Sequence, residues 1–345
     1  MMDFDALIVG GGVAGSATAL ELLAAGWRVG ILHRHDSVCG VESLSPAAAQ
    51  HLERLSIRTG SRLAEVVAWW GSDEVARARP LDARVVERSE LATALRVRAT
   101  EHGAVIIDDA SVLQIERLSN GMRVEYRGHR GEREVIAKFL VDATGRSSVV
   151  GRRFGAHRVD LDQLFCISVP VHEPHLVGTW TESAPDGWWN LCCLSEQGTL
   201  SFYSTAGSVR GSKRDIARGS YETRHLRQVL PAPVFGNSIV RPSDSSRLVP
   251  CAGPGWVAVG DAAFTVQPLA SAGVAKALRD ARLARWALEH DPRNYEAFQL
   301  SELNLYLRQL AQHYALENRW PASPFWQAAN YPSTPTILRP GVTFV

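Results

Sequence analysis

ALIV at residues 6–9, followed by GGGVAGSATALELLAAG at residues 10–26, is the stretch that decides the fold of this 345-residue chain. A short apolar run leads into closely spaced glycines and then into a helical pattern, which indicates a strand, a Gly-rich turn and a helix. Glycines permit a tight turn and let backbone N–H groups approach a pyrophosphate at the positive end of a helix. The stretch therefore predicts a diphosphate-bearing cofactor bound at Gly10, Gly12, Val13, Ala14 and Gly15.

A second Gly-containing segment lies far downstream, in GWVAVGDAAFTVQPLASAG at residues 255–273. A short apolar strand precedes Gly260 and Asp261, and Pro268 precedes a helix that starts near Gly273. A carboxylate at this position is suited to accept hydrogen bonds from ribityl hydroxyls, and a helix N-terminus favours negative charge on a flat ring. The alternative for Asp261 is a turn cap. We expect the two segments to hold one nucleotide between them.

The acidic residue that usually contacts the ribose, about twenty residues after the glycines, is not at its expected place. The second predicted strand, RVGILHRHD at residues 28–36, ends in His33 and Arg34, and Asp36 comes slightly late. Either Asp36 contacts the ribose, or His33 and Arg34 contact the nucleotide in another way. A solvated loop is the alternative for this cluster.

A third segment, KFLVDATGRSS at residues 138–148, ends a predicted strand in a turn. Gly145 lets the backbone pass close to a cofactor, so we expect Asp142, Thr144 and Gly145 near the adenosine end. Arg146 could pair with a phosphate or with Asp142, and a strand-ending turn is the plainer alternative for it.

Composition excludes several classes of protein. The net charge is +1 and no Lys/Arg cluster is dense, so we expect neither a nucleic-acid partner nor a membrane anchor. The start, MMDFD, lacks the order of a secretory signal, and no apolar run approaches the ~18 residues that span a bilayer; we expect a cytoplasmic protein. The five cysteines show no CxxC pair and no metal-ligand spacing, so no metal site is predicted.

Periodicity along the chain predicts further elements. Helices are expected over LSPAAAQHLERL (residues 44–55) and over residues 89–101, 271–290 and 295–319. Short runs between Val105 and Asp142, with an Asn120-Gly121 turn, predict a β-meander. The segments FCISVPV, GWWNLCCL and TLSFYST predict a separate sheet that covers the cofactor. The predicted domains are 1–158 with 241–290 for the cofactor, 159–240 for the β-rich substrate domain, and 291–345 for a C-terminal helix and extended tail.

Five segments, in their order along the chain, carry a family resemblance. They are VESLSPAAAQHLERL (41–55), VDATGRSSVVGRRFGAHRVDLDQL (141–164), APDGWWNLCCL (184–194), GPGWVAVGDAAF (253–264) and YALENRWPASPFW (314–326). The chain resembles the FAD-dependent monooxygenases of the para-hydroxybenzoate hydroxylase type, a superfamily that includes the flavin-dependent tryptophan halogenases. Within it, the chain is most similar to the flavoprotein maturases of amino-acid oxidases that carry a cysteine tryptophylquinone.

The resemblance implies an α/β fold: a Rossmann-like FAD-binding domain of the glutathione-reductase-like GR2 type, an inserted and mostly β substrate domain, and C-terminal helices. It implies a monooxygenase that uses FAD, with NAD(P)H or an external reductase as electron donor. The expected reaction is hydroxylation of an electron-rich aromatic ring through a flavin C4a-hydroperoxide. The ring is either a tryptophan side chain of a partner polypeptide or a free small aromatic molecule; a flavin-binding accessory protein without turnover is the third alternative.

Site residues follow from the motifs and from the resemblance together. Beyond the residues already named, the expected FAD contacts include Glu42, which matches the family's Gly-Glu pair although Val41 replaces its glycine. The complete predicted set is Gly10, Gly12, Val13, Ala14, Gly15, His33, Arg34, Asp36, Glu42, Ser43, Arg88, Asp142, Thr144, Gly145, Gly260, Asp261, Pro268, Ala272 and Gly273. No catalytic base is predicted.

The chain also departs from the family in two places. The WxWxIP pattern of the halogenases has no counterpart, since the nearest segment reads Gly-Trp-Trp-Asn-Leu-Cys at residues 187–192. The usual Pro-Leu-Ser-Ser-Gln-Gly reads Pro-Leu-Ala-Ser-Ala-Gly at residues 268–273, after Gln267 in place of a residue that is often acidic. Trp188 and Trp189, with Glu42, are candidates for the substrate pocket. Because neighbours on a strand point to opposite faces, only one of the two indoles is expected to face the flavin.

Overall fold

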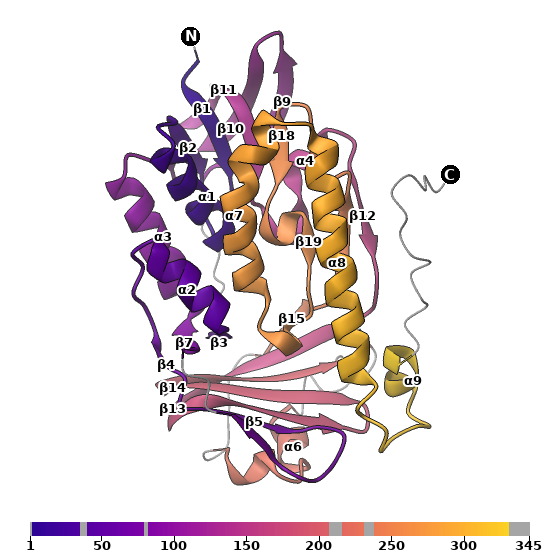
Figure 1. Cartoon of the computed structure of the whole chain (residues 1–345). Coiled ribbons are helices and arrows are strands. Elements are labelled where there is room, and N and C mark those ends of the chain that lie inside the picture. The colour runs from indigo at the N-terminus through magenta and orange to yellow at the C-terminus, as the bar shows by residue number, and fades with distance from the viewer. Residues whose placement is uncertain (1, 35–39, 79–81, 207–215, 231–237, 331–345) are drawn as a thin grey trace.

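The first sheet is built around the N-terminal strand. The computed structural model describes residues 2–34, 40–78, 82–206, 216–230 and 238–330 (Figure 1). The strand order is β17-β18-β11-β1-β2-β8, and all but β17 run parallel. The bounds are β1 (Phe4–Val9), β2 (Val29–Leu32), β8 (Val105–Ile107), β11 (Gly131–Asp142), β17 (Ala252–Gly253) and β18 (Trp256–Ala258). Ala6, Leu7 and Ile8 have no exposed surface, as expected for a parallel strand covered on both faces.

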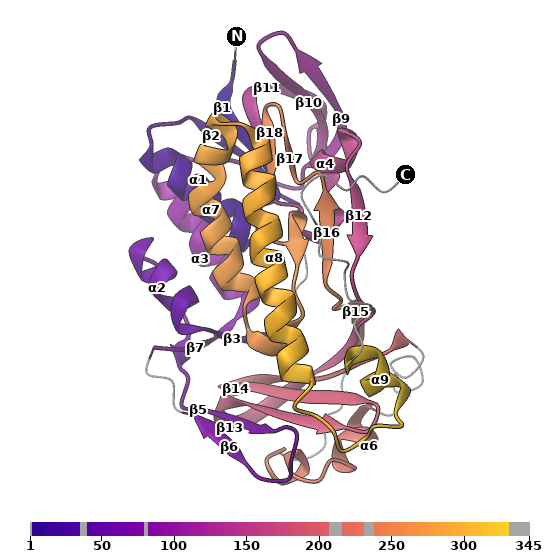
Figure 2. The ribbon, with the colours of Figure 1, turned by 45° about the vertical axis from the view of Figure 1, so that its right-hand side comes forward.

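Helices cover this sheet and lie roughly along its strands. Figures 1 and 2 show α7 and α8 side by side, with α1 next to α7; α3 packs on α1. The predicted helices are confirmed, with shifted ends. They are α1 (Val13–Ala24), α2 (Pro46–Arg54), α3 (Arg88–Glu101), α7 (Gly273–Glu289) and α8 (Pro292–Tyr314). Three short helices were not predicted: α4 (Val149–Arg153), α6 (Ile216–Tyr221) and α9 (Pro324–Asn330). Ser45 caps α2 by accepting a hydrogen bond from the Ala48 N–H, with Pro46 at the first helical position.

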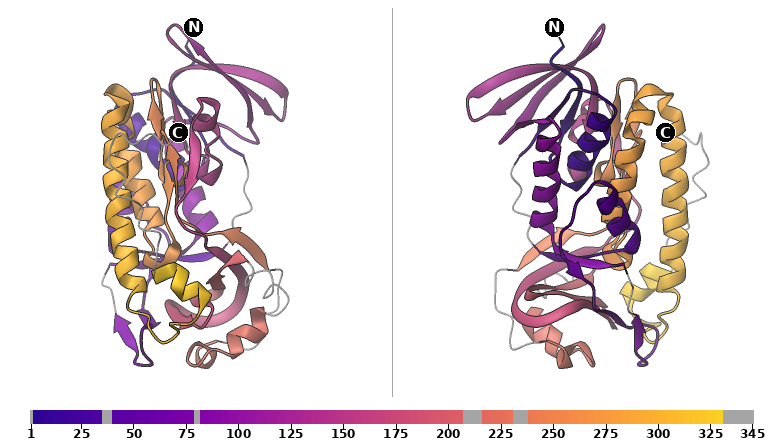
Figure 3. Two further views of the ribbon diagram at one scale, coloured as in Figure 1. Left: turned by 90° about the vertical axis from the view of Figure 1, so that its right-hand side faces the viewer. Right: turned by 60° about the vertical axis from the view of Figure 1, so that its left-hand side comes forward.

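The predicted β-meander is also confirmed. β9 (Ser111–Leu118) and β10 (Gly121–Gly128) are joined by a turn at Ser119-Asn120, one residue before the expected Asn120-Gly121, and β10 pairs with β11. Figure 3 shows this meander projecting from the end of the molecule that lies farthest from the second sheet. The α/β architecture with its second, mostly β body is therefore as the sequence predicts.

The second sheet differs from its prediction in the length of its strands. The three expected strands form two long ones, β13 (Phe165–Ala184) and β14 (Gly187–Ser204), with β5 (Glu65–Trp69), β6 (Ala76–Ala78) and β15 (Ile239–Pro242) beside them. Both long strands turn a corner midway, where Glu173, His175 and Ser195 have positive φ and the β13–β14 register shifts. The corner brings the two ends of β14 together, so that the rings of Trp188 and Tyr203 stack at 3.9 Å.

Side chains change their facing side across this corner. Trp189, Leu191 and Cys193 lie before it and Leu200 and Phe202 after it, yet all five belong to one apolar core. Odd-numbered residues face that core on one side of the corner and even-numbered residues on the other. The corner thus offsets the two-residue period of a strand by one.

One part of the predicted domain boundaries does not match the sheets. β5 and β6 lie within residues 1–158, which the sequence assigned to the cofactor domain, but β5 pairs with β13 of the second sheet. A parallel pairing between segments more than 100 residues apart leaves no local signal in the sequence. The remaining boundaries stay a prediction.

Two small sheets connect the large ones. They consist of β3 (Val41–Leu44), β7 (Arg84–Glu87) and β4 (Ser61–Arg62), and of β12 (His157–Asp160), β16 (Ser246–Val249) and β19 (Phe264–Thr265). Short 3-10 turns are η1 (Gly145–Ser147), η2 (Leu226–Gln228), η3 (Gly260–Ala262) and η4 (Pro268–Ala270). The Val41 N–H of β3 donates to Thr199 Oγ1 of β14 at 2.8 Å, so β3 is fixed directly on the second sheet.

The C-terminal end of α8 and the helix α9 pack against the second sheet. An aromatic cluster joins Trp188 and Tyr203 of β14 to Tyr314, Phe325 and Trp326. Trp326 is buried and donates from Nε1 to the Ala184 carbonyl at 2.9 Å. These C-terminal aromatic residues therefore pack α8 and α9 against the second sheet. Among the described residues, none of the helices combines the length and apolarity that crossing a membrane requires.

A buried carboxylate fastens the segment between α8 and α9. Glu317 accepts hydrogen bonds from Ser183 Oγ at 2.6 Å, from the Gly71 N–H at 2.9 Å and from Arg319 at 2.7 Å. Burial raises the pKa of Glu317, but the hydrogen bonds from Arg319, Ser183 and Gly71 outweigh it and hold that pKa at about 2. Ionised Glu317 therefore stabilises the folded chain.

Replacing Glu317 by Gln should lower the free energy of unfolding by about 3 kcal/mol at pH 7, because Arg319 loses its buried partner. A folded pKa below the unfolded value stabilises above the unfolded pKa, near 4.3, and this stabilisation is lost as pH falls toward the folded value. The difference between wild type and Glu317→Gln should therefore shrink between pH 7 and pH 3.5 in urea unfolding. Glu289→Gln, which breaks an exposed pair with Arg285, should cost under about 1 kcal/mol. A difference that stays constant with pH contradicts the role of the Glu317 charge.

Candidate functional site

The positions of the first turn require glycine for different physical reasons. Gly10 has φ +109°, and a Cβ there would collide with the Ala143 carbonyl at the end of β11. A Cβ on Gly15 would collide with the carbonyl of Gly10, so Gly15 lets α1 pack closely on β1. A Cβ on Gly11 would meet the ring of His33. These three glycines are required by the fold itself.

Gly12 is the exception, since a Cβ there would meet nothing within 4 Å. Gly12 is exposed, has extended backbone and precedes α1 without any side chain capping the helix. The first N–H groups of a helix lack intrahelical partners and attract anions. An open cradle at an uncapped helix N-terminus fits the diphosphate of FAD, at the edge where β1, β2, β11 and β18 have their carboxyl ends.

Gly260 and the glycine turn are in direct contact. Gly260 has φ +59°, and a Cβ there would lie 2.7 Å from the Ala14 methyl of α1. The Gly260 N–H donates to Asp280 Oδ2 at 3.0 Å, and Lys276 Nζ donates to the Gly260 carbonyl at 2.7 Å. Lys276 and Asp280 themselves form a buried ion pair at 2.7 Å. We call this arrangement the Gly260 clamp; it fixes Gly260 against α1.

Two carboxylates remain available beside the clamp. Asp261 is partly exposed, and its carboxylate has no hydrogen-bond partner among the described residues, while its carbonyl accepts from Arg158 at 2.7 Å. Glu42 Oε1 is buried without a hydrogen bond, and Oε2 lies 3.8 Å from Arg88 Nη1. Burial raises the pKa of Glu42, Arg88 lowers it, and the nearby charge of Asp261 raises it further. These unsatisfied acceptors fit a cofactor that carries hydroxyl and N–H donors.

The segment around Pro268 is tied to β3 and to the C-terminal helix. Ser43 Oγ and Ser271 Oγ lie 2.6 Å apart, and Ser271 has φ +49°. Gln267 is buried; its N–H donates to Tyr306 at 2.7 Å, and its Oε1 accepts from Tyr314 at 2.9 Å. Gln267 therefore anchors the segment to α8 instead of facing a ligand. Ala272 and Gly273 lie where α7 begins.

The third predicted segment is mainly structural. Asp142 is fully buried and accepts hydrogen bonds from the N–H and hydroxyl of Thr144 and from the Gly151 N–H. Gly145 has φ +63°. Arg146 forms an ion pair with Asp244 at 3.0 Å, so the proposed pairing of Arg146 with Asp142 is wrong: the two Thr144 donors and the Gly151 N–H already occupy that carboxylate.

Two of the three residues predicted to contact the nucleotide after β2 differ in their environment. His33 is buried against Gly11, whereas Arg34 is exposed. Asp36 lies outside the described residues. Sequence analysis missed Arg96 of α3, which donates from Nη1 to the Gly11 carbonyl at 3.1 Å. A partly buried Arg one helix away from the glycines has no recognisable spacing in the sequence.

Trp188 and Trp189 lie on opposite faces of β14, as strand alternation predicts. Trp188 belongs to the aromatic cluster and donates from Nε1 to Tyr314 at 3.1 Å, while Trp189 lies in the apolar core below the sheet. Both indoles are buried, and their role as substrate walls stays a prediction. Cys192 and Cys193 are free and buried, and burial raises both thiol pKa values, that of Cys193 to about 12. Neither thiol is poised as a thiolate.

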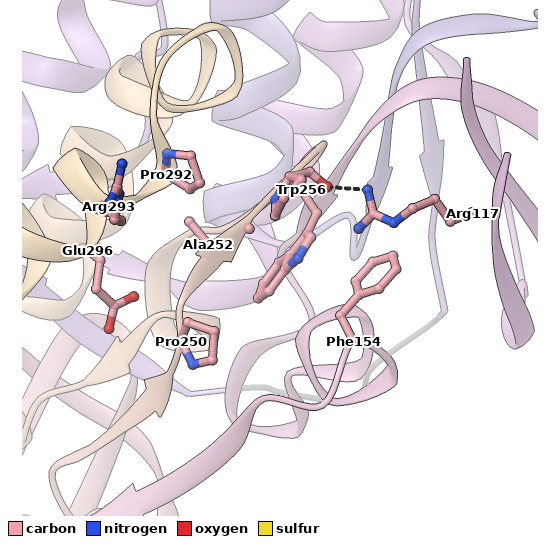
Figure 4. Close-up of a pocket in the computed structure, with 10 residues that line it drawn as sticks. Arg117, Phe154, Pro250, Ala252, Trp256, Pro292, Arg293 and Glu296 are labelled. Carbon is pink, nitrogen blue, oxygen red and sulfur yellow. Dashed lines mark hydrogen bonds between the residues drawn. The ribbon is translucent and has the colours of Figure 1, made fainter. Parts of the chain in front are cut away.

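A cavity of about 300 Å³ lies elsewhere, at the opposite edge of the first sheet. Figure 4 shows it between Trp256 at the start of β18, Pro292 at the start of α8, and Arg117 with Phe154. Arg117 is held there by a 2.8 Å hydrogen bond to the Pro254 carbonyl. Ligands of open α/β sheets bind at the carboxyl ends of the strands, so this cavity is separate from the cofactor site. Among the described residues no cluster of side chains could hold a metal ion.

Comparison with known proteins agrees with this geometry. Residues 42–294 match the FAD binding domain family. The chain belongs to this family. It is 25% identical to LodB of Marinomonas mediterranea, which is named as an FAD-dependent oxidoreductase, over 95% of this chain and 97% of LodB.

Two solved structures share the fold of this chain over nearly its whole length. Peptidyl tryptophan dihydroxylase QhpG, essential for tryptophylquinone cofactor biogenesis, has a TM-score of 0.80 at 21% identity and covers 95% of this chain and 78% of its own. The myxobacterial chondrochloren halogenase CndH has a TM-score of 0.82 at 22% identity and covers 95% and 86%. At these identities the similarity establishes the fold.

Gly12 and Gly15 provide a matched pair of substitutions to Ala. Gly12→Ala should fold with an unfolding free energy within about 1 kcal/mol of wild type, yet bind FAD at least about tenfold more weakly, because its methyl group occupies the diphosphate cradle. Gly15→Ala should lose several kcal/mol of stability through overpacking. Urea unfolding and flavin fluorescence titration measure the two effects. Unchanged FAD affinity in Gly12→Ala would contradict the role of Gly12 in binding the diphosphate.

The Gly260 clamp should show strong coupling. Asp280→Asn leaves Lys276 buried without a charged partner and should cost about 3–5 kcal/mol. The double variant Lys276→Met with Asp280→Asn removes both charges and should cost less than the sum of the two single variants. Urea unfolding of all four proteins gives the coupling energy, with Arg285→Ala as a surface control. Additive costs would contradict a paired clamp.

Proposed function

We propose that this flavoenzyme hydroxylates an electron-rich aromatic ring, and that the ring is a tryptophan side chain of a partner polypeptide. The observation that carries the proposal is the match of fold, over almost the whole chain, to a peptidyl tryptophan dihydroxylase. The open cradle at Gly12, and the packing of Gly260 on Ala14 at the start of the same helix, support the flavin part of the proposal. Bound FAD would supply the activation of O2 and the oxygen transfer.

The residues of the chain would hold and orient that cofactor. Gly12, Val13 and Ala14 present the N-terminus of α1 to the diphosphate, and Arg96 holds the Gly11 carbonyl behind it. With FAD bound, Asp261 would accept hydrogen bonds from the ribityl chain, and Glu42 would accept one from an N–H of the cofactor. The Ser43–Ser271 contact keeps β3 and the Pro268 segment together at the ring. NAD(P)H, bound transiently, or an external reductase supplies electrons.

The test uses purified holoenzyme with FAD, NAD(P)H and a general flavin reductase. Substrates are N-acetyl-tryptophan amide, a tryptophan-containing peptide, free tryptophan and a simple phenol. We expect O2 consumption that increases with the peptide, and a product heavier by one or two oxygen atoms in mass spectrometry. The flavin spectrum shows whether the cofactor is bound.

The outcomes separate the alternatives. Oxygen insertion into the phenol but not into the peptide would move the substrate to free small aromatics. A protein that takes up FAD but neither consumes O2 nor modifies any of these compounds would favour an accessory role. Gly12→Ala, which should bind FAD weakly, is the matched control for flavin-dependent turnover.

A further inference from the structure

The two faces of the second sheet differ in chemistry. One face is the apolar core that includes Val67, Ile167, Trp180, Trp189, Leu191 and Phe202. Pairing in β13 and β14 puts Thr179, Thr181, Asn190, Ser168 and Ser201 on the other face. On this face the hydroxyl and amide groups lie between two smaller apolar clusters, one with Trp188 and Tyr203 and one with Cys192 and Val41. This polar face lies toward β3, since Thr199 on the same side accepts the Val41 N–H.

Asn190 lies between two residues of β14 that connect the strand to the predicted site of the flavin ring. Two residues before it, Trp188 donates to Tyr314, which donates to Gln267 of the Pro268 segment. Two residues after it, Cys192 packs with Val41 of β3, next to Glu42. Alternate residues of a strand lie about 7 Å apart on one face. Asn190 therefore lies between the part of β14 that packs on the Pro268 segment and the part that packs on β3, two segments that the Ser43–Ser271 contact joins.

Asn190 is also the partly exposed residue in this stretch of β14. Within residues 187–193, every residue is buried except Asn190, which is partly exposed. Its neighbours of the same face on β13, Thr179 and Thr181, are engaged with it by hydrogen bonds of 3.0 Å each. A polar side chain that is partly exposed within this otherwise buried stretch is accessible to a ligand.

The amide of Asn190 has a fixed orientation. Nδ2 donates to Thr179 Oγ1, to Thr181 Oγ1 and, at 3.4 Å, to the Trp180 carbonyl. The hydroxyls could also donate, but the carbonyl only accepts, so the NH2 group must face it. Oδ1 consequently points away from these three partners, and among the described residues it accepts no hydrogen bond. It is a pre-oriented acceptor.

We propose that Asn190 Oδ1 accepts the ring N–H of an indole substrate and so determines specificity. The inference rests on the proposed function, because it assumes an aromatic substrate beside the flavin. An indole carries one polar group, its N–H, and a buried N–H requires an acceptor. Thr179 and Thr181 are positioning residues that hold the Asn190 amide.

The test measures binding to oxidised holoenzyme, which needs no electron donor. The probes are N-acetyl-tryptophan amide and its 1-methyltryptophan counterpart, followed by changes in the flavin absorbance spectrum. Wild type should bind the N–H compound about tenfold more tightly, the value of one hydrogen bond to a buried partner. Asn190→Ala removes the acceptor and leaves room for the methyl group, so the ratio should fall to near one.

Asn190→Asp is the matched control, because it keeps an acceptor at the same place and should retain the preference for the N–H compound. An Asn190→Ala protein with normal flavin binding and an unchanged ratio overturns the role of Asn190 while leaving the proposed function intact. Wild-type holoenzyme that binds neither indole compound counts against the tryptophan substrate itself, and therefore against both.

Discussion

The Gly260 clamp is the interaction on which the cofactor site depends. Gly260 is separated from the glycine turn by more than 200 residues, and its contact with Ala14 requires a positive φ at a strand end. A buried Lys276–Asp280 pair uses both backbone polar groups of Gly260, so the segment has one position relative to α1. A buried ion pair contributes little net stability but is costly to break. Here it fixes geometry: it holds Asp261 where the cradle at Gly12 opens.

Much of this arrangement could be predicted from the sequence, for physical reasons. The Gly-rich turn and the helices α1, α2, α3, α7 and α8 have local signals, such as glycine spacing, Pro46 after Ser45, and apolar periodicity. The clamp could not be predicted, because a Lys and an Asp four residues apart on a helix usually form an exposed pair. Only the fold shows that Lys276 and Asp280 are buried.

Gln267 shows how a departure from a family pattern can mislead. It replaces a residue that is often acidic in the family, next to the segment that the sequence predicts at the flavin. In the folded chain its side chain instead accepts from Tyr314, and its N–H donates to Tyr306. The two tyrosines come from α8, whose sequence gives its helical period but not its partners. The position of β5 could not be predicted either, because its parallel pairing with β13 leaves no local pattern in the sequence.

The corner in β13 and β14 has a consequence for how this enzyme family can diversify. Because the corner already offsets the alternation by one residue, it is a place where a strand can gain or lose a residue without melting the sheet. A single-residue change of length on the Asn190 side of the corner would exchange the side chains on the face toward β3 for those now in the core. The chemistry of each face of such a sheet therefore depends on strand length as much as on residue identity.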